Sequence, residues 1–349
     1  MKVALLSNQG LVGGGEVMLL AVAHALRSLG HAPIIVGPSH HPDVLIRAHR
    51  AGHAVAGIRT RGRAHYLVAL RRWARSSDAP LLWANGMLPA TATSGMPRRI
   101  VHLHQVPSPR LQPLVPAALH RATAVIVPSQ WVAARVPGAQ ALPNWTADQC
   151  LTPHASHPTR TGGPLRVGFL GRTTEDKGIH DLIAAANTLT TAAPQLDVEL
   201  HIGGETRFSN AAEHRSVAAA LKQSHAPVIQ HGWVEPSEFL AGIDVLAVPS
   251  NWGEAFGLVA AEALSAGVPV LVSDDGALPE VVGPHHDLVV RAGDADDLAR
   301  GLRRVAHVRA VEEIDALVRN GRRRWEEHFS PAAGEARIAA LMTHVEDTL

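Results

Sequence analysis

Two glutamates, eight positions apart, stand out in an otherwise apolar segment of the chain. Glu254 lies in a glycine-flanked loop, and Glu262 lies inside an Ala/Leu/Val stretch, residues 258–267, whose composition predicts a buried helix. A carboxylate in such surroundings is costly unless it is hydrogen-bonded. Ribose hydroxyls would satisfy Glu262, because a carboxylate can accept hydrogen bonds from both hydroxyls of a diol. An internal pairing with a nearby cation or backbone group is the alternative.

Two cations follow a predicted strand further upstream. The strand, residues 165–171, ends in glycine, and Arg172 and Lys177 then bracket a short polar loop before a predicted helix. Cations at the carboxyl edge of a strand, beside a helix N-terminus, form a clamp suited to a diphosphate. The competing interpretation is a pair of solvated surface cations. Gly253 and Gly257 place further backbone N–H groups near a helix start, which is a second place for an anion.

A glycine cluster near the N-terminus follows the first predicted strand and opens a helix. It runs from Ser7 to Val17 and includes Gly13 and Gly14. Glycine lets a backbone approach a ligand closely, and a helix N-terminus attracts anions. The spacing is not Gly-x-Gly-x-x-Gly, and no acidic residue ends the second strand, so we expect no NAD site. A tight turn without a ligand is the alternative.

Two histidines lie at the end of another predicted strand. His102 and His104 alternate with apolar residues, so they share one face of the strand. His104 comes last, where a parallel strand delivers side chains to a ligand cleft, and we expect it to act there. No Asp or Glu lies close by in the sequence to complete a metal site, so we predict none.

Short apolar strands alternate with helical patterns along the chain, which predicts parallel sheets with crossover helices. The alternation stops at a Pro-, Thr- and Gly-rich segment and then starts again. The expected fold class is α/β, with two tandem doubly wound, Rossmann-like domains and a ligand site in the cleft that they face. The predicted strands are residues 2–7, 32–37, 81–85, 98–104, 122–129, 165–171, 197–204, 227–232, 244–250 and 268–274.

The expected boundaries are a first domain over 1–150, a linker over 151–164, a second domain over 165–329 and a final helix over 330–349. Charge separates the two halves. Residues 1–150 carry 15 Lys and Arg but only four Asp and Glu, whereas the remainder is net acidic. A basic first half favours an anionic partner, and a solvated arginine-rich surface is the alternative.

Length and composition fit a two-domain protein: the chain has 349 residues, of which 46% are hydrophobic and 18% charged. The single cysteine, Cys150, excludes an internal disulfide framework and a cysteine-based zinc site. The first residues lack the pattern of a signal peptide, and no stretch approaches the roughly 20 apolar residues that span a bilayer. We therefore expect a cytoplasmic protein.

Several segments together resemble the retaining GT-B glycosyltransferases of family 4. The most specific is EAFGLVAAEALSAGVPV, which contains Glu254 and Glu262. The others are GGGE near the N-terminus, LPNW before the linker, GFLGRTTEDKG after it, and GALPEVV beyond the two glutamates. The resemblance extends from Gly13 to Glu280 and implies the GT-B fold, in which two Rossmann-like domains face a cleft.

The resemblance implies a retaining, hexosyltransferase-type enzyme that moves a sugar from a nucleotide-diphosphate sugar to a hydroxyl acceptor. The donor, a UDP-, GDP-, ADP- or TDP-sugar, is expected in the C-terminal domain, with the N-terminal domain on the acceptor side and the final helix crossing back to it. No metal or other cofactor is expected, because no Asp-x-Asp motif lies in the relevant place. The rivals are an epimerase of the same fold, which would need more first-domain acids, and a non-catalytic nucleotide-sugar-binding protein.

The resemblance also implies roles for individual residues. Glu254 would contact the donor sugar, Glu262 the ribose hydroxyls, and His104 the sugar or the reacting centre. The expected catalytic residues are His104, Glu254, Arg172 and Lys177, of which the two cations would hold the diphosphate and offset its charge. The expected donor-binding residues are Gly13, Gly14, Arg172, Lys177, Gly232, Trp233, Glu254, Phe256, Gly257, Leu258 and Glu262, with Gly232 and Trp233 near the base. Trp145 stands where the family more often has glycine.

The acceptor is expected to meet the basic N-terminal domain, which suits an anionic or lipid-linked molecule. Residues 66–75 predict an amphipathic helix in an arginine-rich segment. It fits peripheral contact with anionic lipid at the inner face of a membrane. It fits better a helix packed on the sheet with a solvated basic face. We expect no nucleic-acid partner, because the basic half lacks interleaved aromatic residues.

Overall fold

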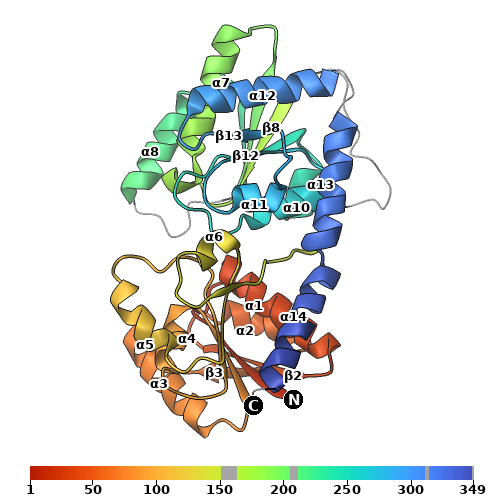
Figure 1. The fold of residues 1–349 in the computed structure, drawn as a ribbon. Helices are drawn as coiled ribbons and strands as arrows, with labels where there is room; N and C mark the ends of the chain where they lie inside the picture. Colours follow the sequence, from red (N-terminus) through yellow and green to blue (C-terminus); the bar gives the residue numbers. More distant parts are fainter. Residues whose placement is uncertain (151–162, 205–210, 311–313, 348–349) are drawn as a thin grey trace. The chain divides into compact units, whose positions relative to one another are not determined.

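The computed structural model describes residues 1–150, 163–204, 211–310 and 314–347 (Figure 1). The chain forms two compact units. The first comprises Met1–Trp145 together with Pro331–Leu349, and the second comprises Thr146–Ser330. Of the expected linker, residues 151–162 lie outside the described residues. Among the helices that the structure describes, none is both long and apolar enough to span a bilayer.

The first unit is built on a seven-stranded parallel sheet in the order β3-β2-β1-β4-β5-β6-β7. This is the doubly wound order, in which the chain reverses direction beside the first strand. The expected parallel α/β architecture is confirmed. The strands are β1 (Lys2–Leu6), β2 (Ala32–Pro38), β3 (Ala54–Ile58), β4 (Leu81–Asn85), β5 (Arg99–His102), β6 (Ala124–Val127) and β7 (Gln140–Ala141).

Helices cover this sheet, and the last of them comes from the end of the chain. The helices are α1 (Gly14–Ser28), α2 (Asp43–Arg50), α3 (Arg63–Ser76), α4 (Met87–Ala92), α5 (Val115–Leu119), α6 (Gln130–Ala133) and α14 (Pro331–Glu346), with a 3-10 turn η1 (Gln112–Leu114). The helix expected over 66–75 is present as α3. Its apolar side chains Tyr66, Leu70 and Ala74 are buried in the core of the unit.

The second unit is built on a six-stranded parallel sheet in the order β10-β9-β8-β11-β12-β13. The strands are β8 (Leu165–Leu170), β9 (Val198–Gly203), β10 (Val228–Gly232), β11 (Val245–Val248), β12 (Val270–Ser273) and β13 (Val289–Val290). The helices are α7 (Ile179–Ala192), α8 (Ala211–Lys222), α9 (Pro236–Leu240), α10 (Leu258–Ala266), α11 (Leu278–Val282), α12 (Ala295–Ala310) and α13 (Ile314–His328), with a 3-10 turn η2 (Glu175–Lys177).

Two apolar layers enclose the second sheet. α7 and α12 pack on one face, where Leu182 and Leu302 are fully buried, and α10, α11 and α13 pack on the other (Figure 1). Parallel strands covered on both faces are apolar throughout rather than alternating. All four residues of β11 are buried accordingly. The continuous apolar runs in the sequence are therefore explained by the double covering.

Two strands of the first sheet are missing from the sequence prediction: β3 and the two-residue strand β7. β3 forms the edge of the sheet, and of its five residues only Ile58 is buried. Ala54, Val55 and Gly57 are exposed, so the segment shows neither the continuous apolar run of a central strand nor a clean alternation. It was not recognisable because an edge strand is held mainly by backbone hydrogen bonds to its neighbour.

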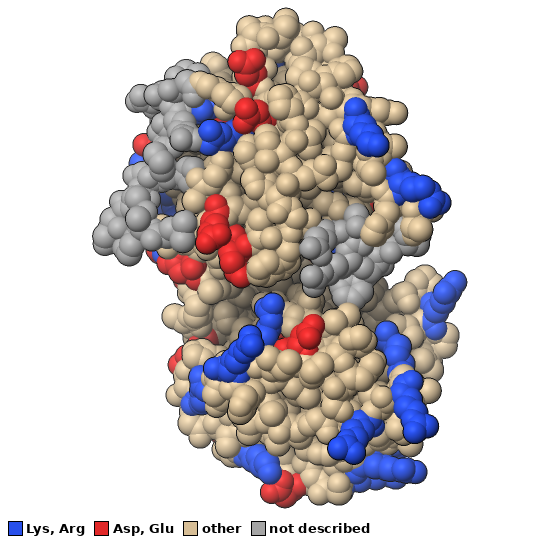
Figure 2. Space-filling model, turned by 180° about the vertical axis from the view of Figure 1, so that it is seen from behind, with Lys and Arg blue, Asp and Glu red and all other residues tan. Residues whose placement is uncertain are grey.

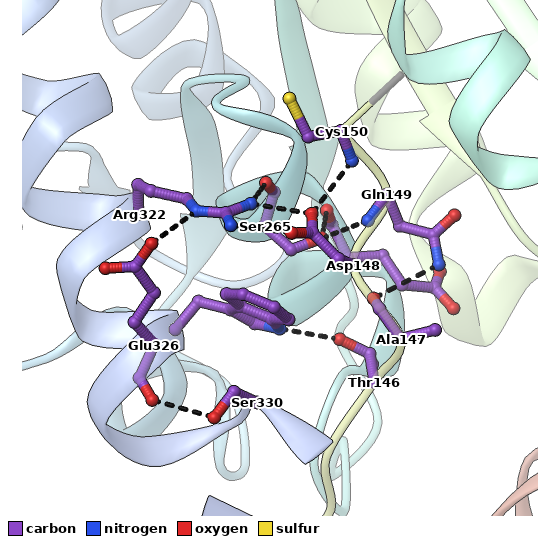
Figure 3. Close-up of polar contacts among 11 residues, drawn as sticks. Thr146, Ala147, Asp148, Gln149, Cys150, Ser265, Arg322, Glu326 and Ser330 are labelled. Atoms are coloured by element: carbon purple, nitrogen blue, oxygen red, sulfur yellow. Dashed lines mark hydrogen bonds and ion pairs between the residues drawn. The ribbon is translucent and has the colours of Figure 1, made fainter. Parts of the chain in front are cut away.

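The expected boundary at residue 150 lies too far along the chain, because Thr146 onwards belongs to the second unit. Figure 3 shows the reason. Both Asp148 oxygens accept hydrogen bonds from Arg322 of α13, each at 2.6 Å, and Thr146 accepts one from the Trp325 indole at 2.9 Å. The Gln149 backbone N–H donates to the Ser265 hydroxyl at 3.1 Å. These side-chain contacts are distant in sequence, so the local pattern does not reveal them.

The chain returns to the first unit in its final helix. α14 groups with the first unit, and its Ile338, Met342 and Val345 are buried. Trp145, the last residue before the boundary, is only 4% exposed and lies against α14 at Gly334. The Arg337 guanidinium also donates to the Pro143 carbonyl at 3.1 Å. The tryptophan at this position is therefore part of the core that anchors α14.

Candidate donor-binding site

In the second unit, the expected cations and the first glutamate lie on two neighbouring loops. β8 and β11 pair in parallel, with Val167 opposite Val245. Their carboxyl ends therefore share one edge of the sheet. Arg172 and Lys177 follow β8, and Glu254 follows β11. The alternation of strands and helices thus places three predicted site residues at the edge where ligands of such sheets bind.

Lys177 and Glu254 are in direct contact across these loops. The Lys177 ammonium donates to Glu254 Oε2, and the Ser250 hydroxyl donates to the same oxygen at 3.2 Å. The Glu254 side chain is 13% exposed and that of Lys177 is 27% exposed. An ammonium group has three N–H donors, so two remain after the contact with Glu254. The pair therefore keeps both hydrogen-bonding capacity and access to solvent.

The loop that carries Glu254 is held by its backbone. The Glu254 N–H donates to Asp275 Oδ2 at 2.9 Å, and its carbonyl accepts from the Ala277 N–H at 2.8 Å. Both partners come from the turn after β12. Because both backbone groups are bonded, the position of the carboxylate is determined by the sheet edge rather than by its contact with Lys177 alone.

A glycine allows the two loops to approach each other. Gly178 follows Lys177 with φ +74°, and a Cβ atom at this position would lie 1.9 Å from the Pro249 carbonyl oxygen. Next to this contact, the Asn251 N–H donates to the Asp176 carbonyl at 3.1 Å. A side chain at Gly178 would push the loops apart. The glycine therefore supports the contact between Lys177 and Glu254.

Arg172 is paired within its own loop. Its Nη2 lies 3.0 Å from Asp176 Oδ2, and the arginine side chain is 43% exposed. A guanidinium has five N–H donors in a planar fork, and this pair uses one of them. Arg172 therefore retains donors directed at solvent on the same loop as Lys177. That arrangement suits an anion with several oxygen atoms.

Glu262 lies in the second turn of α10. Its carboxylate has no hydrogen bond or ion pair within the described part of the chain, and burial raises its pKa to about 7. A carboxyl group of this kind gains from hydroxyl donors, because they replace the solvation that burial removes. The structure does not show the internal cation or backbone pairing that the sequence left open.

The start of α10 presents backbone rather than side chains. Phe256 is 4% exposed and packs edge-to-face on Phe329 at 5.4 Å, so its ring belongs to the core. Gly257 caps the helix, which begins at Leu258. The first N–H groups of a helix have no partner within it. Phe256, Gly257 and Leu258 can therefore offer a ligand only their main-chain groups and the partly buried Leu258 side chain.

Gly232 and Trp233 lie on the same sheet edge but apart from this cluster. Gly232 is the last residue of β10, the edge strand, and Trp233 follows it; β9 separates β10 from β8. The Gly232 carbonyl accepts from the Gly204 N–H at 2.6 Å, and the Trp233 side chain is exposed. Among the described residues, no hydrogen bond or ion pair joins either residue to Arg172. The structure brings them to the correct edge but not into contact.

In the first unit, Gly13 and Gly14 form the start of α1. Gly13 is the N-cap, and its N–H donates to Glu16 Oε2 at 3.3 Å. Gln9 Nε2 donates to the same oxygen at 3.1 Å. Glu16 is 3% exposed, and burial raises its pKa to about 6, although both hydrogen bonds lower it. The glycine loop is therefore held by a buried carboxyl group.

His104 lies just beyond the end of β5. Its Nε2 is 2.7 Å from Asn85 Oδ1, and its ring lies 4.1 Å from that of His102, measured between centroids. Burial lowers the pKa of His104 to about 4 and that of His102 well below its ordinary value. Both imidazoles are therefore neutral at pH 7. A neutral imidazole can bind a hydroxyl, but it does not supply a positive charge.

Several residues of these two clusters were not identified from the sequence. Ser250 and Asp275 hold Glu254. Gln9 and Glu16 hold the glycine loop, and Asn85 contacts His104. Asn85 carried a usable signal, because it is the last residue of a predicted strand and such residues point toward ligand sites in parallel sheets. Asp275 had no such signal, since its contact depends on the neighbouring strand.

Part of the chain matches a known protein family. Residues 155–324 match the family described as Glycosyl transferases group 1. This segment contains Arg172, Lys177, Glu254 and Glu262. The matched segment lies entirely within the second unit, so the match covers the candidate donor-binding cluster and not the glycine loop.

Curated relatives resemble part of this chain over part of their own length. Over 165 residues, the chain is 27% identical to the capsular polysaccharide biosynthesis glycosyltransferase CapM of Staphylococcus aureus, covering 47% of this chain and 42% of CapM. Over 109 residues it is 38% identical to the MMP alpha-(1->4)-mannosyltransferase of Mycolicibacterium hassiacum, covering 31% and 26% of the two chains. The chain thus matches less than half the length of these relatives.

Solved structures resemble the whole chain. Anabaena Alr3699/HepE in complex with UDP-glucose superimposes with a TM-score of 0.82 at 20% identity, covering 98% of this chain and 99% of that one. Sucrose-phosphate synthase from Thermosynechococcus elongatus gives a TM-score of 0.80 at 21% identity over both complete chains. The fold, with its two parallel-sheet units, is the GT-B fold.

Proposed function

We propose that this chain is a metal-independent, retaining glycosyltransferase that moves a sugar from a nucleoside-diphosphate sugar to a hydroxyl acceptor. The observation that carries the proposal is the contact of Lys177 with Glu254 at the sheet edge of the group 1 segment. It places a cation with spare donors beside a carboxylate that can bind sugar hydroxyls. The named activities of the relatives and the UDP-glucose complex of HepE support the same substrate class.

The donor would be held by three kinds of group. Arg172 and Lys177 would bind the diphosphate through their N–H donors. The unpartnered carboxylate of Glu262 would accept hydrogen bonds from the two ribose hydroxyls. Glu254 would accept from hydroxyls of the transferred sugar. Backbone N–H groups at Gly257 and Leu258 would add donors near the phosphate, as helix N-termini do for anions.

These groups favour breaking of the bond between the anomeric carbon and the phosphate oxygen. As that bond lengthens, negative charge grows on the diphosphate, where the fixed donors of Arg172 and Lys177 stabilise it. The acceptor oxygen then forms a bond to the anomeric carbon on the same face. Its proton passes to the departing phosphate oxygen. No residue of this chain is required as a covalent nucleophile in that route.

The first unit would contribute the remaining contacts. Gly14 is exposed at the first turn of α1, and Gly13 is fixed by Glu16, so the loop presents backbone to a ligand. His104 would contact the transferred sugar as a neutral imidazole. It would serve as a hydrogen-bonding group and not as a charged acid, because its pKa lies near 4. This role agrees with a mechanism in which the leaving phosphate takes the acceptor proton.

A donor panel tests the central proposal. The full-length chain is heated with UDP-, GDP-, ADP- and TDP-sugars, and its thermal midpoint is compared with that of the unliganded chain. We expect one nucleotide class to raise the midpoint, since a ligand at 100 times its Kd adds about 2.7 kcal/mol to stability. A panel in which no nucleotide-sugar shifts the midpoint would contradict the proposal.

Turnover separates an enzyme from a binding protein. With the stabilising donor, we expect slow release of free nucleoside diphosphate, faster in the presence of a hydroxyl acceptor and unchanged by EDTA. NMR of the product would show the same anomeric configuration as the donor. Binding without release, even with a range of acceptors, would favour a nucleotide-sugar-binding protein. Loss of activity in EDTA that Mg²⁺ or Mn²⁺ restores would contradict metal independence.

We also propose that the acceptor side of the protein meets an anionic surface through α3. The apolar side of α3 is packed in the core, so insertion of that face into lipid is excluded. Five exposed arginines lie on or next to this helix: Arg59, Arg61, Arg63, Arg72 and Arg75. Contact would therefore be electrostatic and would suit an anionic or lipid-linked acceptor.

A further inference from the structure

Asn85 connects the histidine of the first unit to the glycine loop. It is the last residue of β4 and is fully buried. Its Oδ1 lies 2.7 Å from His104 Nε2, and its Nδ2 donates to the Gly15 carbonyl at 3.0 Å. One amide side chain therefore bonds simultaneously to an imidazole after β5 and to the first turn of α1.

The second of these bonds determines the direction of the first. An amide NH₂ can only donate and an amide oxygen can only accept. The Gly15 carbonyl can only accept, so the Asn85 amide must place its nitrogen toward Gly15 and its oxygen toward His104. A neutral imidazole that meets an acceptor must donate. The proton of His104 therefore lies on Nε2, and Nδ1 carries a lone pair.

That lone pair has no protein partner. His104 Nδ1 is buried and has no hydrogen bond among the described residues. The only ring in contact with His104 that the structure describes is His102, whose nitrogen atoms also lack partners. His104 Nδ1 is therefore a buried acceptor without a protein partner, held in a fixed orientation. The opposite tautomer would present a donor there.

Close packing limits the ring further. A Cβ atom on Gly15 would lie 2.8 Å from His104 Cδ2, so glycine at this position lets α1 approach the imidazole. Gly86, next to Asn85, donates its N–H to the His102 carbonyl at 2.7 Å, which fixes the backbone on both sides. The ring is thus constrained in position by α1 and in tautomer by Asn85.

We propose that Asn85 is a positioning residue that holds His104 as the Nε2–H tautomer, so that Nδ1 accepts a hydrogen bond from a hydroxyl of the transferred sugar. The proposal rests on the proposed function for its ligand, but the tautomer is a property of the protein alone. Asn85 itself touches neither the sugar nor the reacting atoms. Its effect on the reaction passes through His104 and through the first turn of α1.

Three substitutions separate the two bonds of Asn85. Asn85→Asp keeps an acceptor for Nε2–H and loses the donor to Gly15. Asn85→Leu has a similar volume and loses both bonds. Thr93→Val removes another fully buried polar group of the same unit and serves as the control for general loss of stability. The Thr93 hydroxyl donates to the Pro89 carbonyl and accepts from the Arg99 guanidinium.

The first readout is the ¹⁵N NMR signal of the His104 ring, assigned by comparison with His104→Gln. Protonated and unprotonated ring nitrogens have well separated shifts. We expect a single Nε2–H tautomer in the wild type, in Asn85→Asp and in Thr93→Val, and a mixture of tautomers in Asn85→Leu. A wild-type His104 protonated on Nδ1, or an unchanged ring in Asn85→Leu, would overturn the proposal.

The second readout is catalysis with the donor found by the panel. We expect kcat of Asn85→Leu to fall by about tenfold or more, because misplacement of a contacting group lowers the rate. Asn85→Asp should recover most of that loss. The Kd of the nucleoside diphosphate without sugar should change less than about twofold, because its proposed contacts lie in the second unit. Equal kcat in Asn85→Leu and the wild type would reject the positioning role.

The two readouts distinguish failure of this inference from failure of the proposed function. If no nucleotide-sugar binds, the proposed function fails, whereas the tautomer experiment still tests Asn85. If the donor is turned over and Asn85→Leu loses activity only in proportion to its loss of folded protein, as Thr93→Val does, Asn85 has a structural role alone and the inference is wrong.

Discussion

Glu16 and Glu262 are carboxyl groups whose pKa values burial raises, to about 6 and about 7. They differ in their partners. Glu16 accepts hydrogen bonds from Gln9 and Gly13, which stabilise its charged form and limit the rise. Burial is the single cause of the raised pKa of Glu262. The partner-free carboxylate is therefore the one best suited to receive hydroxyl donors from a ligand.

Donor affinity should depend on the ionisation of Glu262. A carboxylate accepts both ribose hydrogen bonds, whereas a protonated carboxyl must use one oxygen as a donor. With a pKa near 7, we expect affinity for the nucleotide-sugar to rise about tenfold between pH 6 and pH 8. The diphosphate of a nucleotide-sugar does not titrate in this range. Calorimetry at several pH values measures the dependence.

Glu262→Gln is the control for that titration. Its affinity should be lower at pH 8 and should change little with pH. The stability of Glu262→Gln, in contrast to its affinity, should exceed that of the wild type at pH 8. Because the pKa of Glu262 is raised in the folded state, ionisation of this group opposes folding as pH rises from about 4.5 to about 7. Glu262→Gln should therefore raise the thermal midpoint at pH 8 but not at pH 4. Equal nucleotide affinity of variant and wild type at pH 8 would rule out the ribose role.

At the scale of elements, α13 holds the start of the second unit through one arginine. Arg322 bonds both oxygens of Asp148 and also the Glu326 carboxylate at 2.9 Å, and it contacts the Ser265 carbonyl (Figure 3). The hydrogen bond from Arg322 keeps the pKa of Asp148 below its ordinary value. The arrangement ties α13 and the end of α10 to the segment at which the chain enters the second unit.

Arg322→Met should weaken this attachment. The methionine keeps much of the packing volume and removes the bidentate pair. Asp148 is partly exposed, so we expect a loss of only about 1–2 kcal/mol and a thermal midpoint lower by about 3 °C. Arg323→Met, on the neighbouring exposed position of α13, should lie within about 0.5 kcal/mol of the wild type. Equal midpoints of the two variants would mean that the Arg322 contacts contribute nothing to stability.

At the scale of the whole molecule, the two units differ in charge. Exposed arginines of α3 and its preceding loop belong to the first unit, and blue side chains gather on that unit in Figure 2. In the second unit, several arginines are paired locally, such as Arg300 with Asp297 at 2.7 Å. A field of one sign on the first unit favours anionic partners there, whereas acidic residues outnumber basic ones after residue 150.

The basic surface predicts salt-sensitive binding to anionic vesicles. At low ionic strength, we expect the protein to co-sediment with vesicles rich in phosphatidylserine and to be released by about 0.5 M salt, because screening shortens the range of the attraction. Reversal of two charges on α3, in Arg72→Glu with Arg75→Glu, should reduce binding by at least tenfold.

The matched control reverses two exposed arginines of the second unit, Arg303 and Arg304. It changes the net charge by the same amount and should leave most vesicle binding intact. If the protein fails to bind vesicles at low salt, the membrane proposal is rejected. Equal losses in the two double variants would mean that net charge rather than α3 controls binding.

Much of the site could be predicted from local patterns. Arg172, Lys177, Glu254 and Glu262 lie at ends of predicted strands or on a predicted helix, and parallel sheets present such positions at one edge. The apolar runs located the central strands because both faces of each sheet are covered. β3 was missed since an exposed edge strand carries little apolar pattern. The unit boundary was misplaced because contacts such as Asp148 to Arg322 join residues far apart in the sequence.

Local sequence patterns are enough to predict the α/β class, the two tandem sheets, the family resemblance and the residue types at the strand ends. The partners of those residues became known from the folded structure. It placed Lys177 on Glu254, left Glu262 without a partner, packed the apolar face of α3 inward, and set Asn85 between His104 and Gly15. The two kinds of information differ in the sequence distance between the residues involved. Periodicity and strand ends are properties of neighbouring residues, whereas hydrogen bonds, burial and the pKa shifts they cause arise between segments that only folding brings together.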